Sequence, residues 1–487
     1  MTRLPRTAAT LAVLAAVLVG AGLRLALMFD RALNYDEAAT AYFAGLSLAD
    51  LWGDTGRLET NPPLFYTLVG LLARLGMPAE YFRLAAVVPD VASIALAAAL
   101  AGRLGGGFAA AAAAWLVATS PMMLDVGLEA RAYALLAMLG LAMAVLAVRV
   151  LDGGGRRDLV LLALAEIAAL YTHNTAVIML AAVNGMALLC WLGRPPRDRA
   201  LAARWLVVQG VVAVAWLPWL PVVVGQASDD LAQFWIARPG LMALRYEFQR
   251  LGGQPMVRWP QPLADLVFLG LAGLGLLRVW LGARRDRGLA VGLAVMLLAG
   301  APIATWLISQ WRPLMNGRVL LWLVPFFLVL VAVALGWRAR WAAAVLAALL
   351  AVQLSTLPAR RAAREAEPWR EVAAMLNGGM RAGDALYLSA APALLVLAHH
   401  GWRDEGHRLF AAREGRWYRR FPGTILAPDA AAAVLAKAGR LWIVTRRDSP
   451  AHDALVARLA PAMAEARLLR AGPRPDSGLD VSLLRHR

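Results

Sequence analysis

The chain has 487 residues, of which 60% are hydrophobic, and its mean hydropathy is +0.59. A soluble domain is closer to half apolar, so the long apolar runs that recur to about Leu357 predict a polytopic α-helical membrane protein. The single cysteine, Cys190, excludes an internal disulfide and a cysteine-based metal site. The net charge of +17 would suit a nucleic-acid partner. However, the arginines gather in short loops between apolar runs, which is the positive-inside pattern and needs no such partner.

The apolar runs predict about eleven membrane spans, since a spanning helix needs ~20 apolar residues. The first run, from about Thr7 to Phe29, has no convincing small-residue cleavage site and is followed by more spans, which argues against a signal peptide. Arg3 and Arg6 place the N-terminus in the cytoplasm, and arginine-rich loops then fall on that side at every second connection. The expected spans are residues 8–28, 84–102, 107–124, 132–150, 158–173, 175–193, 204–224, 263–282, 288–309, 318–336 and 340–357.

This topology requires that the stretch from Pro62 to Gly76 does not cross the membrane. The stretch is short for a span, and we expect a juxtamembrane or re-entrant segment on the outer side, where protein can bury it. If it crossed, every later loop would be inverted and the arginine clusters would face outward. The outer face then receives loops 29–83 and 225–262, and the second is long enough to fold over a site as a mobile lid.

The composition changes after Pro358. Helical patterns over Trp369–Met380 and Pro392–His400, and strand patterns over 384–389 and 441–445, predict a small α/β domain, with a further helix after Ser449. We therefore expect a transmembrane domain over residues 1–358 and a soluble domain on the outer face over residues 359–487. Neither contains a dinucleotide or P-loop fingerprint. His399 and His400 are adjacent on a helix and so point in different directions, which argues against a ligand pair.

The acidic pair Asp36-Glu37 follows directly on the first apolar run. A charged side chain at the membrane edge costs free energy unless it is solvated or ion-paired, so one that is retained there often has a function. One carboxylate could take a proton from an acceptor hydroxyl while an anionic leaving group departs, because partial burial can tune its pKa. The alternative is an acidic N-cap with a second acid in the first turn of a helix from Ala38 to Leu48. The position alone leaves both interpretations open.

A second polar group lies between the third and fourth spans, where Glu129, Arg131 and Tyr133 alternate with alanines. At this spacing they would not share a helix face, but in an extended or turning loop they can converge. Arg131 could hold a phosphate through bidentate hydrogen bonds. The alternative is an interfacial ion pair with an aromatic anchor.

Three more polar residues are expected at the outer face. His173 lies between two apolar runs and could bind phosphate or metal or satisfy a buried carboxylate, although a satisfied interfacial histidine is the commoner case. Arg83 and Arg318 flank spans on the outer side, against the positive-inside trend. A lipid-linked phosphate or pyrophosphate would explain them, and capping or snorkelling is the alternative.

These motifs occur in a characteristic order along the chain. In sequence they are Asn34-Tyr35-Asp36-Glu37-Ala38, Asn61-Pro62-Pro63-Leu64-Phe65-Tyr66, Arg83-Leu84, Ser120-Pro121, the run Glu129 to Tyr133, Tyr171-Thr172-His173-Asn174 and Pro368-Trp369-Arg370-Glu371. Over nearly the whole chain, this order and spacing resembles the GT-C superfamily of membrane glycosyltransferases. Within it, the chain is similar to the bacterial family-39-like branch, which is related to protein O-mannosyltransferases and lipid A aminoarabinose transferases.

The resemblance implies an inverting transfer of a hexosyl or pentosyl group from a polyprenyl-phosphate carrier to an envelope lipid, glycan or protein. The reaction would take place at the outer face of the bacterial inner membrane. It implies that Asp36 is the base or acceptor-positioning carboxylate, with Glu37 beside it. The residues implied near the donor phosphate or substrate are Arg83, Glu129, Arg131, Tyr133, His173 and Arg318. Those implied on the acceptor side, or in a structural role, are Tyr35, Asn61, Pro62 and Pro63.

Two departures from the family pattern limit this transfer of roles. Many relatives have histidine at the position of Asn61, so a histidine role cannot be carried over there. Many also have an aromatic residue where this chain has Asn174. Both departures are consistent with a different acceptor or sugar.

The sequence leaves two other functional classes and a metal site open. A transporter or lipid flippase of envelope precursors would tend to show internal repeats and charges near the bilayer midplane, whereas here the charges gather at one face. An envelope assembly protein would leave the outer-face carboxylates and arginines unexplained. Asp36, Glu37 and Glu129 could form an oxygen-ligand site for Mg or Mn, and no paired-histidine spacing supports zinc.

Overall fold

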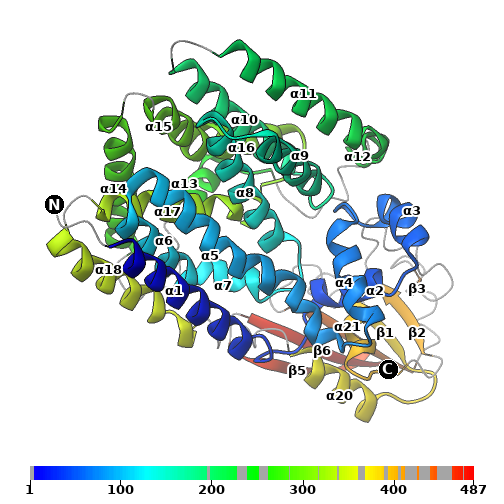
Figure 1. Ribbon diagram of the computed structural model, residues 1–487. Coiled ribbons are helices and arrows are strands. Elements are labelled where there is room, and N and C mark those ends of the chain that lie inside the picture. Colours follow the sequence, from blue (N-terminus) through cyan, green and yellow to red (C-terminus); the bar gives the residue numbers. More distant parts are fainter. Residues whose placement is uncertain are drawn as a thin grey trace.

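The computed structural model describes residues 5–194, 198–227, 238–251, 261–283, 286–315, 317–336, 339–359, 368–388, 393–403, 407–411, 425–426, 439–446, 463–474 and 477–486. Apolar helices form one part of the molecule, and a six-stranded sheet lies at one end of it, close to α2, α4 and α21 (Figure 1). The statements below concern these residues.

A helix lies at each of the predicted spans. In chain order they are α1 (Arg6–Leu27), α5 (Leu84–Gly105), α6 (Gly107–Thr119) with α7 (Pro121–Gly127), α8 (Tyr133–Leu151), α9 (Arg156–Leu170), α10 (Ala176–Leu192), α11 (Arg199–Trp216) with η2 (Leu217–Trp219) and α12 (Leu220–Ala227), α14 (Gln261–Leu281), α15 (Arg287–Ala294) with η5 (Val295–Gly300) and α16 (Ala301–Trp311), η6 (Leu321–Leu323) with α17 (Val324–Leu335), and α18 (Ala339–Leu354). Within the described residues, six helical runs are long and apolar enough to cross a membrane, and the bent pair α6–α7 would make seven. Others, such as α10, are apolar but shorter, so the number of eleven stays a prediction.

The span expected over 107–124 is broken into two helices that are bent by 58°. The break falls at Ser120-Pro121. Proline has no N–H to continue the helix ladder, and it is well suited to the first position of a new helix. The Ser120 side chain accepts a hydrogen bond from the Met123 N–H at 3.4 Å and so caps α7. This bend turns the chain toward the loop that carries Glu129.

Small residues allow some of the helices to approach closely. Gly288 and Gly292 lie one turn apart on α15, where a methyl group would stand 2.4 Å from the Leu189 carbonyl oxygen and 2.7 Å from the Met186 side chain of α10, respectively. Hydrophobic contact alone drives helix association weakly in lipid, so close backbone approach at small residues is a common solution.

A buried ion pair joins α1 to α5. The Arg24 Nε lies 2.5 Å from the Asp90 Oδ2, and neither side chain is exposed. Arg24 Nη1 also donates to the carbonyl oxygens of Gly20 and Ala118, at 3.0 and 2.9 Å, so the arginine links α1 to α6 as well. Because most of α1 is exposed, this pair is a major polar attachment of the first span.

Short elements form the segment between the first two spans. They are α2 (Tyr35–Ala44), α3 (Leu48–Leu58), α4 (Leu64–Arg74) and η1 (Ala79–Arg83). With 11 residues, α4 is about 16 Å long, roughly half of a hydrocarbon core. This length supports the prediction that the stretch from Pro62 to Gly76 does not cross the membrane.

The second long loop contains one helix in its described part, α13 (Leu241–Leu251). This helix is amphipathic, and its residues Leu241, Met242 and Tyr246 are exposed. The rest of the predicted lid, residues 228–237 and 252–260, lies outside the described residues.

The C-terminal sheet has the strand order β3-β2-β1-β4-β6-β5. The strands are β1 (Ala385–Leu388), β2 (Arg408–Ala411), β3 (Ile425–Leu426), β4 (Arg440–Arg446), β5 (Met463–Arg474) and β6 (Ser477–His486). The first four are parallel, and β6 is antiparallel to both β4 and β5. α20 (Trp369–Gly379) and α21 (Ala393–His399) occupy the positions of the two predicted helices. The helix expected after Ser449 lies outside the described residues.

Candidate functional site

The site is organised around the N-terminus of α2. Asn34 is the N-cap, and its side chain accepts the Glu37 N–H at 2.8 Å while Glu37 Oε2 accepts the Asn34 N–H at 3.1 Å. This is a capping box, which satisfies two otherwise unpaired backbone donors. The alternative interpretation of the sequence had placed an acidic residue at the cap. The cap is Asn34, and Asp36 and Glu37 both lie in the first turn, where the helix dipole favours negative charge.

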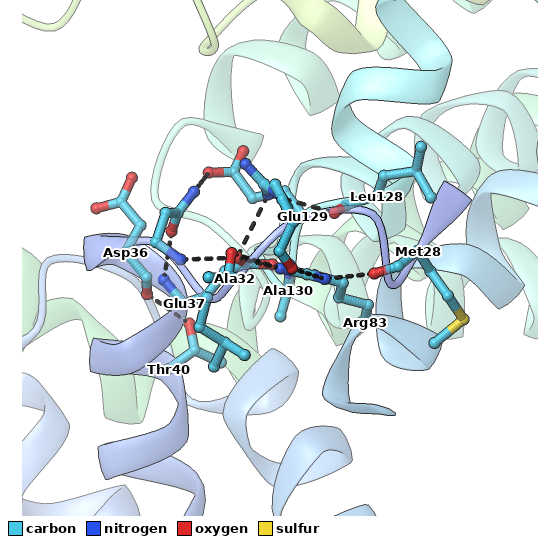
Figure 2. Close-up of polar contacts among 12 residues, drawn as sticks. Met28, Ala32, Asp36, Glu37, Thr40, Arg83, Leu128, Glu129 and Ala130 are labelled. Carbon is cyan, nitrogen blue, oxygen red and sulfur yellow. Dashed lines mark hydrogen bonds and ion pairs between the residues drawn. The ribbon is translucent and has the colours of Figure 1, made fainter. Parts of the chain in front are cut away.

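Glu37 is fully buried and surrounded by donors (Figure 2). Its carboxylate receives Nε and Nη2 of Arg83 at 2.7 and 2.8 Å, and the Ala130 N–H at 3.1 Å. Arg31 Nη2 lies 3.4 Å away. Burial alone would raise the pKa of the Glu37 carboxyl, but Arg31 and Arg83 outweigh it and lower the pKa from 4.5 to about 2. A carboxylate held in this way is a poor proton acceptor, so the contacts do not favour the predicted catalytic role for Glu37.

Arg83 is directed entirely toward the chain itself. Besides Glu37, its guanidinium donates to the backbone carbonyls of Met28, Arg31 and Ala32, and only 1% of the residue is exposed. All three guanidinium nitrogens are therefore engaged in holding the loop before α2. The predicted donor-phosphate role of Arg83 does not fit this arrangement, because the side chain is already enclosed by protein acceptors.

Asp36 presents its carboxylate to a different group, on the side away from Arg83 (Figure 2). Arg318 Nη1 lies 2.5 Å from Asp36 Oδ2 and 3.5 Å from Glu129 Oε1. The side chains of Asp36 and Arg318 are 33% and 45% exposed, so this pair, unlike Glu37–Arg83, is open to a ligand. The structure thus brings together three predicted residues from the loop after α1, the loop after α7 and the segment before α17.

Glu129 is the buried member of this group. Asn34 Nδ2 donates to its Oε1 at 3.2 Å, which links the helix cap to the loop after α7. Burial raises the pKa of the Glu129 carboxyl above its ordinary value, against the opposing charge of Arg318, and the nearby Asp36 charge raises it further. Asp36 and Glu129 share Arg318 but have different surroundings, because the Asp36 carboxylate is partly exposed and the Glu129 carboxylate is buried.

Tyr133 extends the group toward α9 and α10. The Arg318 guanidinium carbon lies 6.0 Å from the centroid of the Tyr133 ring, within cation–π range. The Tyr133 ring in turn lies 5.8 Å from the His173 ring. Arg131 Nη1 is directed at the Tyr66 hydroxyl, 3.4 Å away. The predicted residues Asp36, Glu129, Tyr133, His173 and Arg318 thus form one connected group, with Arg131 at its edge.

His173 is held as a neutral imidazole. Its Nδ1 accepts the Thr175 N–H at 3.2 Å and lies 2.7 Å from the Thr175 hydroxyl, which leaves Nε2 as the protonated nitrogen. Burial, with the Arg131 charge, lowers the pKa of His173 from 6.5 to about 4. At neutral pH it therefore offers one N–H donor and no positive charge to a phosphate.

The residues predicted on the acceptor side lie in buried structural positions. Pro62 and Pro63 are buried before α4, and the half-buried Tyr35 packs against the C-terminal part of the chain. Asn61 is 7% exposed, and its Nδ2 donates to Glu59 Oε1 at 3.0 Å. The structure alone does not mark any of these four as a substrate contact.

Several polar residues next to this segment were not predicted. Glu59 is 5% exposed and accepts four hydrogen bonds from Thr60 and Asn61 on one oxygen. Gln226, at the end of α12, donates to the Glu59 carbonyl at 2.9 Å and accepts from Asn174 Nδ2 at 2.9 Å. No local pattern indicates these contacts, which join three separate segments.

Arg31 was also missed, although the sequence carries a signal for it. It is an arginine directly after the first span on the predicted outer side, where the positive-inside rule disfavours one. The same argument had singled out Arg83 and Arg318. In the structure Arg31 contacts Glu37 and donates to the Leu128 carbonyl at 3.3 Å.

The trio Asp36, Glu37 and Glu129 does not converge as a metal site. Glu37 faces Arg83, and Arg318 stands between the other two carboxylates. Across the described part of the chain, no group of three or more His, Cys, Asp or Glu side chains is placed to hold a metal ion.

Comparisons with known proteins support the architecture. No family model matches the sequence, and a search of curated proteins gives no significant match. Among solved structures, ArnT from Cupriavidus metallidurans in the apo state is similar with a TM-score of 0.64 at 15% identity, over 98% of this chain and 97% of that one. ArnT bound to undecaprenyl phosphate gives 0.63 at the same identity and coverage.

A second similar structure is the archaeal oligosaccharyltransferase AglB from Archaeoglobus fulgidus, in complex with an inhibitory peptide and a dolichol-phosphate. It has a TM-score of 0.57 at 12% identity, over 97% of this chain and 74% of that one. Identities this low establish the fold and not the activity. The chain therefore shares its fold with the ArnT and AglB structures, which agrees with the resemblance that the order of its motifs indicates.

Proposed function

We propose that this protein is an inverting glycosyltransferase that moves a sugar from a polyprenyl-phosphate carrier to a cell-envelope acceptor. The observation that carries the proposal is the partly exposed Asp36–Arg318 pair beside the buried Glu129, on the fold of two proteins whose structures hold undecaprenyl phosphate and dolichol-phosphate. The group combines a partly exposed carboxylate with an arginine, which are the two elements that such a transfer needs.

Asp36 is the proposed base. The acceptor hydroxyl or amine passes its proton to Asp36 while its oxygen or nitrogen bonds to the anomeric carbon of the sugar. The bond from that carbon to the phosphate oxygen breaks, and the electron pair leaves with the lipid phosphate, so the configuration at the anomeric carbon inverts. A base must lie within hydrogen-bond reach of the reacting proton, and the 33% exposure of the Asp36 side chain leaves room for an acceptor.

Arg318 is the proposed phosphate ligand. Arginine presents N–H donors in a planar fork, and Arg318 Nη1 lies against Asp36 and Glu129. Because the Arg318 side chain is 45% exposed, a phosphate can reach the guanidinium while the arginine keeps its carboxylate partners. This position would stabilise the negative charge that develops on the leaving phosphate, with Arg131 as a second cation and the His173 Nε2–H as a neutral donor.

Glu37 and Arg83 act in this proposal as the support of the site. Their buried pair fixes the loop before α2, so that Asp36 projects to the opposite side.

The domain assignment is part of the same proposal. Residues 1–358, with outer loops 29–83 and 225–262, form the transmembrane catalytic domain, and residues 359–487 form a soluble α/β domain. Both the site and this domain face the periplasm of the inner membrane, and the sugar is a hexose or pentose.

The experiment is sugar transfer by membranes that contain Asp36→Asn, with a radiolabelled polyprenyl-phosphate sugar as donor and envelope lipids and glycans as acceptors. We expect about 10²- to 10⁴-fold lower transfer, as for removal of a general base, with unchanged membrane insertion. Asp50→Asn is the matched control, because Asp50 is an exposed acid of the same outer loop that pairs with Ser47. Full activity of Asp36→Asn would refute the assignment, and lipid translocation in vesicles without a covalent product would favour a flippase instead.

A further inference from the structure

The first turn of α2 has two faces with different neighbours. Asp36 and Glu37 face the charged group described above. Ala38, which is 3% exposed, belongs instead to the hydrophobic core of the C-terminal part, and Tyr35 packs against that core. Residues three apart lie on the same side of a helix, so one stripe of α2 is buried by residues from beyond position 368. The orientation of this turn is therefore set from outside the membrane part.

The contact is made by α21, which packs on α2 (Figure 1). At the end of α21, His400 Nε2 lies 3.1 Å from the carbonyl oxygen of Leu33. A carbonyl can only accept, so Nε2 carries the proton and donates. Leu33 is 1% exposed and directly precedes the Asn34 cap. This bond therefore ends on the backbone of the segment that begins the helix bearing Asp36.

The neighbouring histidine lies close to a second supporting segment. His399 Nε2 lies 3.7 Å from Glu80 Oε1. Glu80 is in η1, the element that ends at Arg83, and Arg83 holds the same loop through the carbonyls of Met28, Arg31 and Ala32. The adjacent histidines point in different directions, as the sequence suggested. His400 contacts the loop before α2, and His399 lies beside η1. Both segments support Asp36.

We propose that α21 of the C-terminal domain positions the reacting carboxylate: His400, through the Leu33 carbonyl, fixes the loop before α2 and so the placement of Asp36. This inference rests on the proposed function, because it assigns the reacting group to Asp36. His400 touches no reacting atom in this scheme and is a positioning residue. The soluble domain is thereby a working part of the site and not a separate docking module.

The environment of His400 suits this role. Burial lowers the pKa of His400, against the opposing effect of its bond to Leu33, while the charge of Arg370 lowers it further and that of Glu80 raises it. This direction favours the neutral ring, whose Nε2–H donates the hydrogen bond to the Leu33 carbonyl. A loop that is misplaced by about 1 Å can cost on the order of 10²-fold in rate, because reacting groups must be held in near-attack geometry.

The test compares full-length His400→Leu, which removes the donor, with His400→Gln, whose amide can reach the same carbonyl. Arg403→Gln is the control, since Arg403 is an exposed residue beyond the end of the same helix. Deuterium uptake of peptides covering residues 28–37 is measured in detergent without any substrate. Transfer kinetics are measured separately. We expect faster uptake in His400→Leu only, and a kcat roughly 10- to 100-fold lower with the KM for the lipid donor changed less than twofold.

The two readouts separate this inference from the proposed function. Equal uptake in His400→Leu and the native chain would overturn the inference, as would kcat and KM that are unchanged in a variant with faster uptake. Equal losses in His400→Gln and His400→Leu would also overturn it, because the hydrogen bond would then not matter. If the native chain transfers no sugar while His400→Leu still raises uptake at 28–37, the proposed function fails and the structural link stands.

Discussion

The buried pair Glu37–Arg83 gives a prediction whose size and pH dependence both follow from the structure. Replacing Glu37 by Gln leaves the guanidinium of Arg83, which is 1% exposed, beside a neutral amide. Breaking a buried ion pair by removing one partner costs about 3–5 kcal/mol, because the other charge stays buried without compensation. We therefore expect a clearly lower apparent Tm for Glu37→Gln at pH 7. Adding Arg83→Gln to the Glu37→Gln chain should restore part of the lost Tm, because no buried charge is then left unpaired.

The pH dependence follows from the lowered pKa of Glu37. Its pKa falls from 4.5 to about 2 in the folded state, so between these values the unfolded chain binds more protons. The contribution of Glu37 is fully present above about pH 4.5 and is lost as the pH falls toward 2, and its full size is about 3 kcal/mol. The difference in Tm between the native chain and Glu37→Gln should therefore narrow as the pH falls from 5 to 3.

The assay is differential scanning fluorimetry of detergent-purified protein across pH 7 to 3. Subtracting the variant from the native chain removes the titration of the other acids, which both proteins share. Asp50→Asn, at an exposed acid, should show no such narrowing. A Glu37→Gln protein as stable as the native chain at pH 7, or a difference in Tm that does not change with pH, would refute the assignment of Glu37 as a buried, ionised support.

Three further predictions concern the span interface and the site. Asp90→Ala should destabilise the chain by about 3–5 kcal/mol in detergent unfolding, because it leaves Arg24 buried and unpaired, and Arg24→Leu in the same chain should recover much of the loss. Gly127→Ala should lower the Tm, since its methyl group would stand 2.0 Å from Asp90 Oδ2, whereas Gly53→Ala has no atom within 4 Å and should not. His173→Gln should leave the shape of the pH–rate profile between pH 5.5 and 8 unchanged, because a pKa of about 4 keeps His173 neutral there; loss of an ionisation in that range would contradict this.

Much of the membrane part could be predicted from local pattern. Apolar runs marked the helices, and the low fit of residues 62–76 to a span agrees with an α4 of only 11 residues. The break within 107–124 was missed even though Pro121 signals it, because mean hydropathy continues smoothly through a bend. The order of the outer motifs also predicted the fold that the comparison with solved structures shows.

The roles of single residues were less predictable. The sequence does not distinguish the roles of four charged residues, since each lies next to a predicted span at the membrane edge: Asp36, Glu37, Arg83 and Arg318. The structure separates them by enclosure: Glu37 and Arg83 are buried against each other, while Asp36 and Arg318 are partly open. The sequence leaves open whether His173 binds a phosphate, and its burial makes it a neutral donor instead of a cation.

The sequence by itself determined where the chain can cross a membrane and which charged residues lie outside the spans, because hydropathy and charge are summed over neighbouring residues. Only the tertiary structure decided which of those charges meet. Asp36 and Arg318 are 282 positions apart and His400 and Leu33 are 367 apart, so their contacts depend on how helices and sheet pack. No local pattern encodes that packing, which places α21 against α2, the helix that carries the acidic pair.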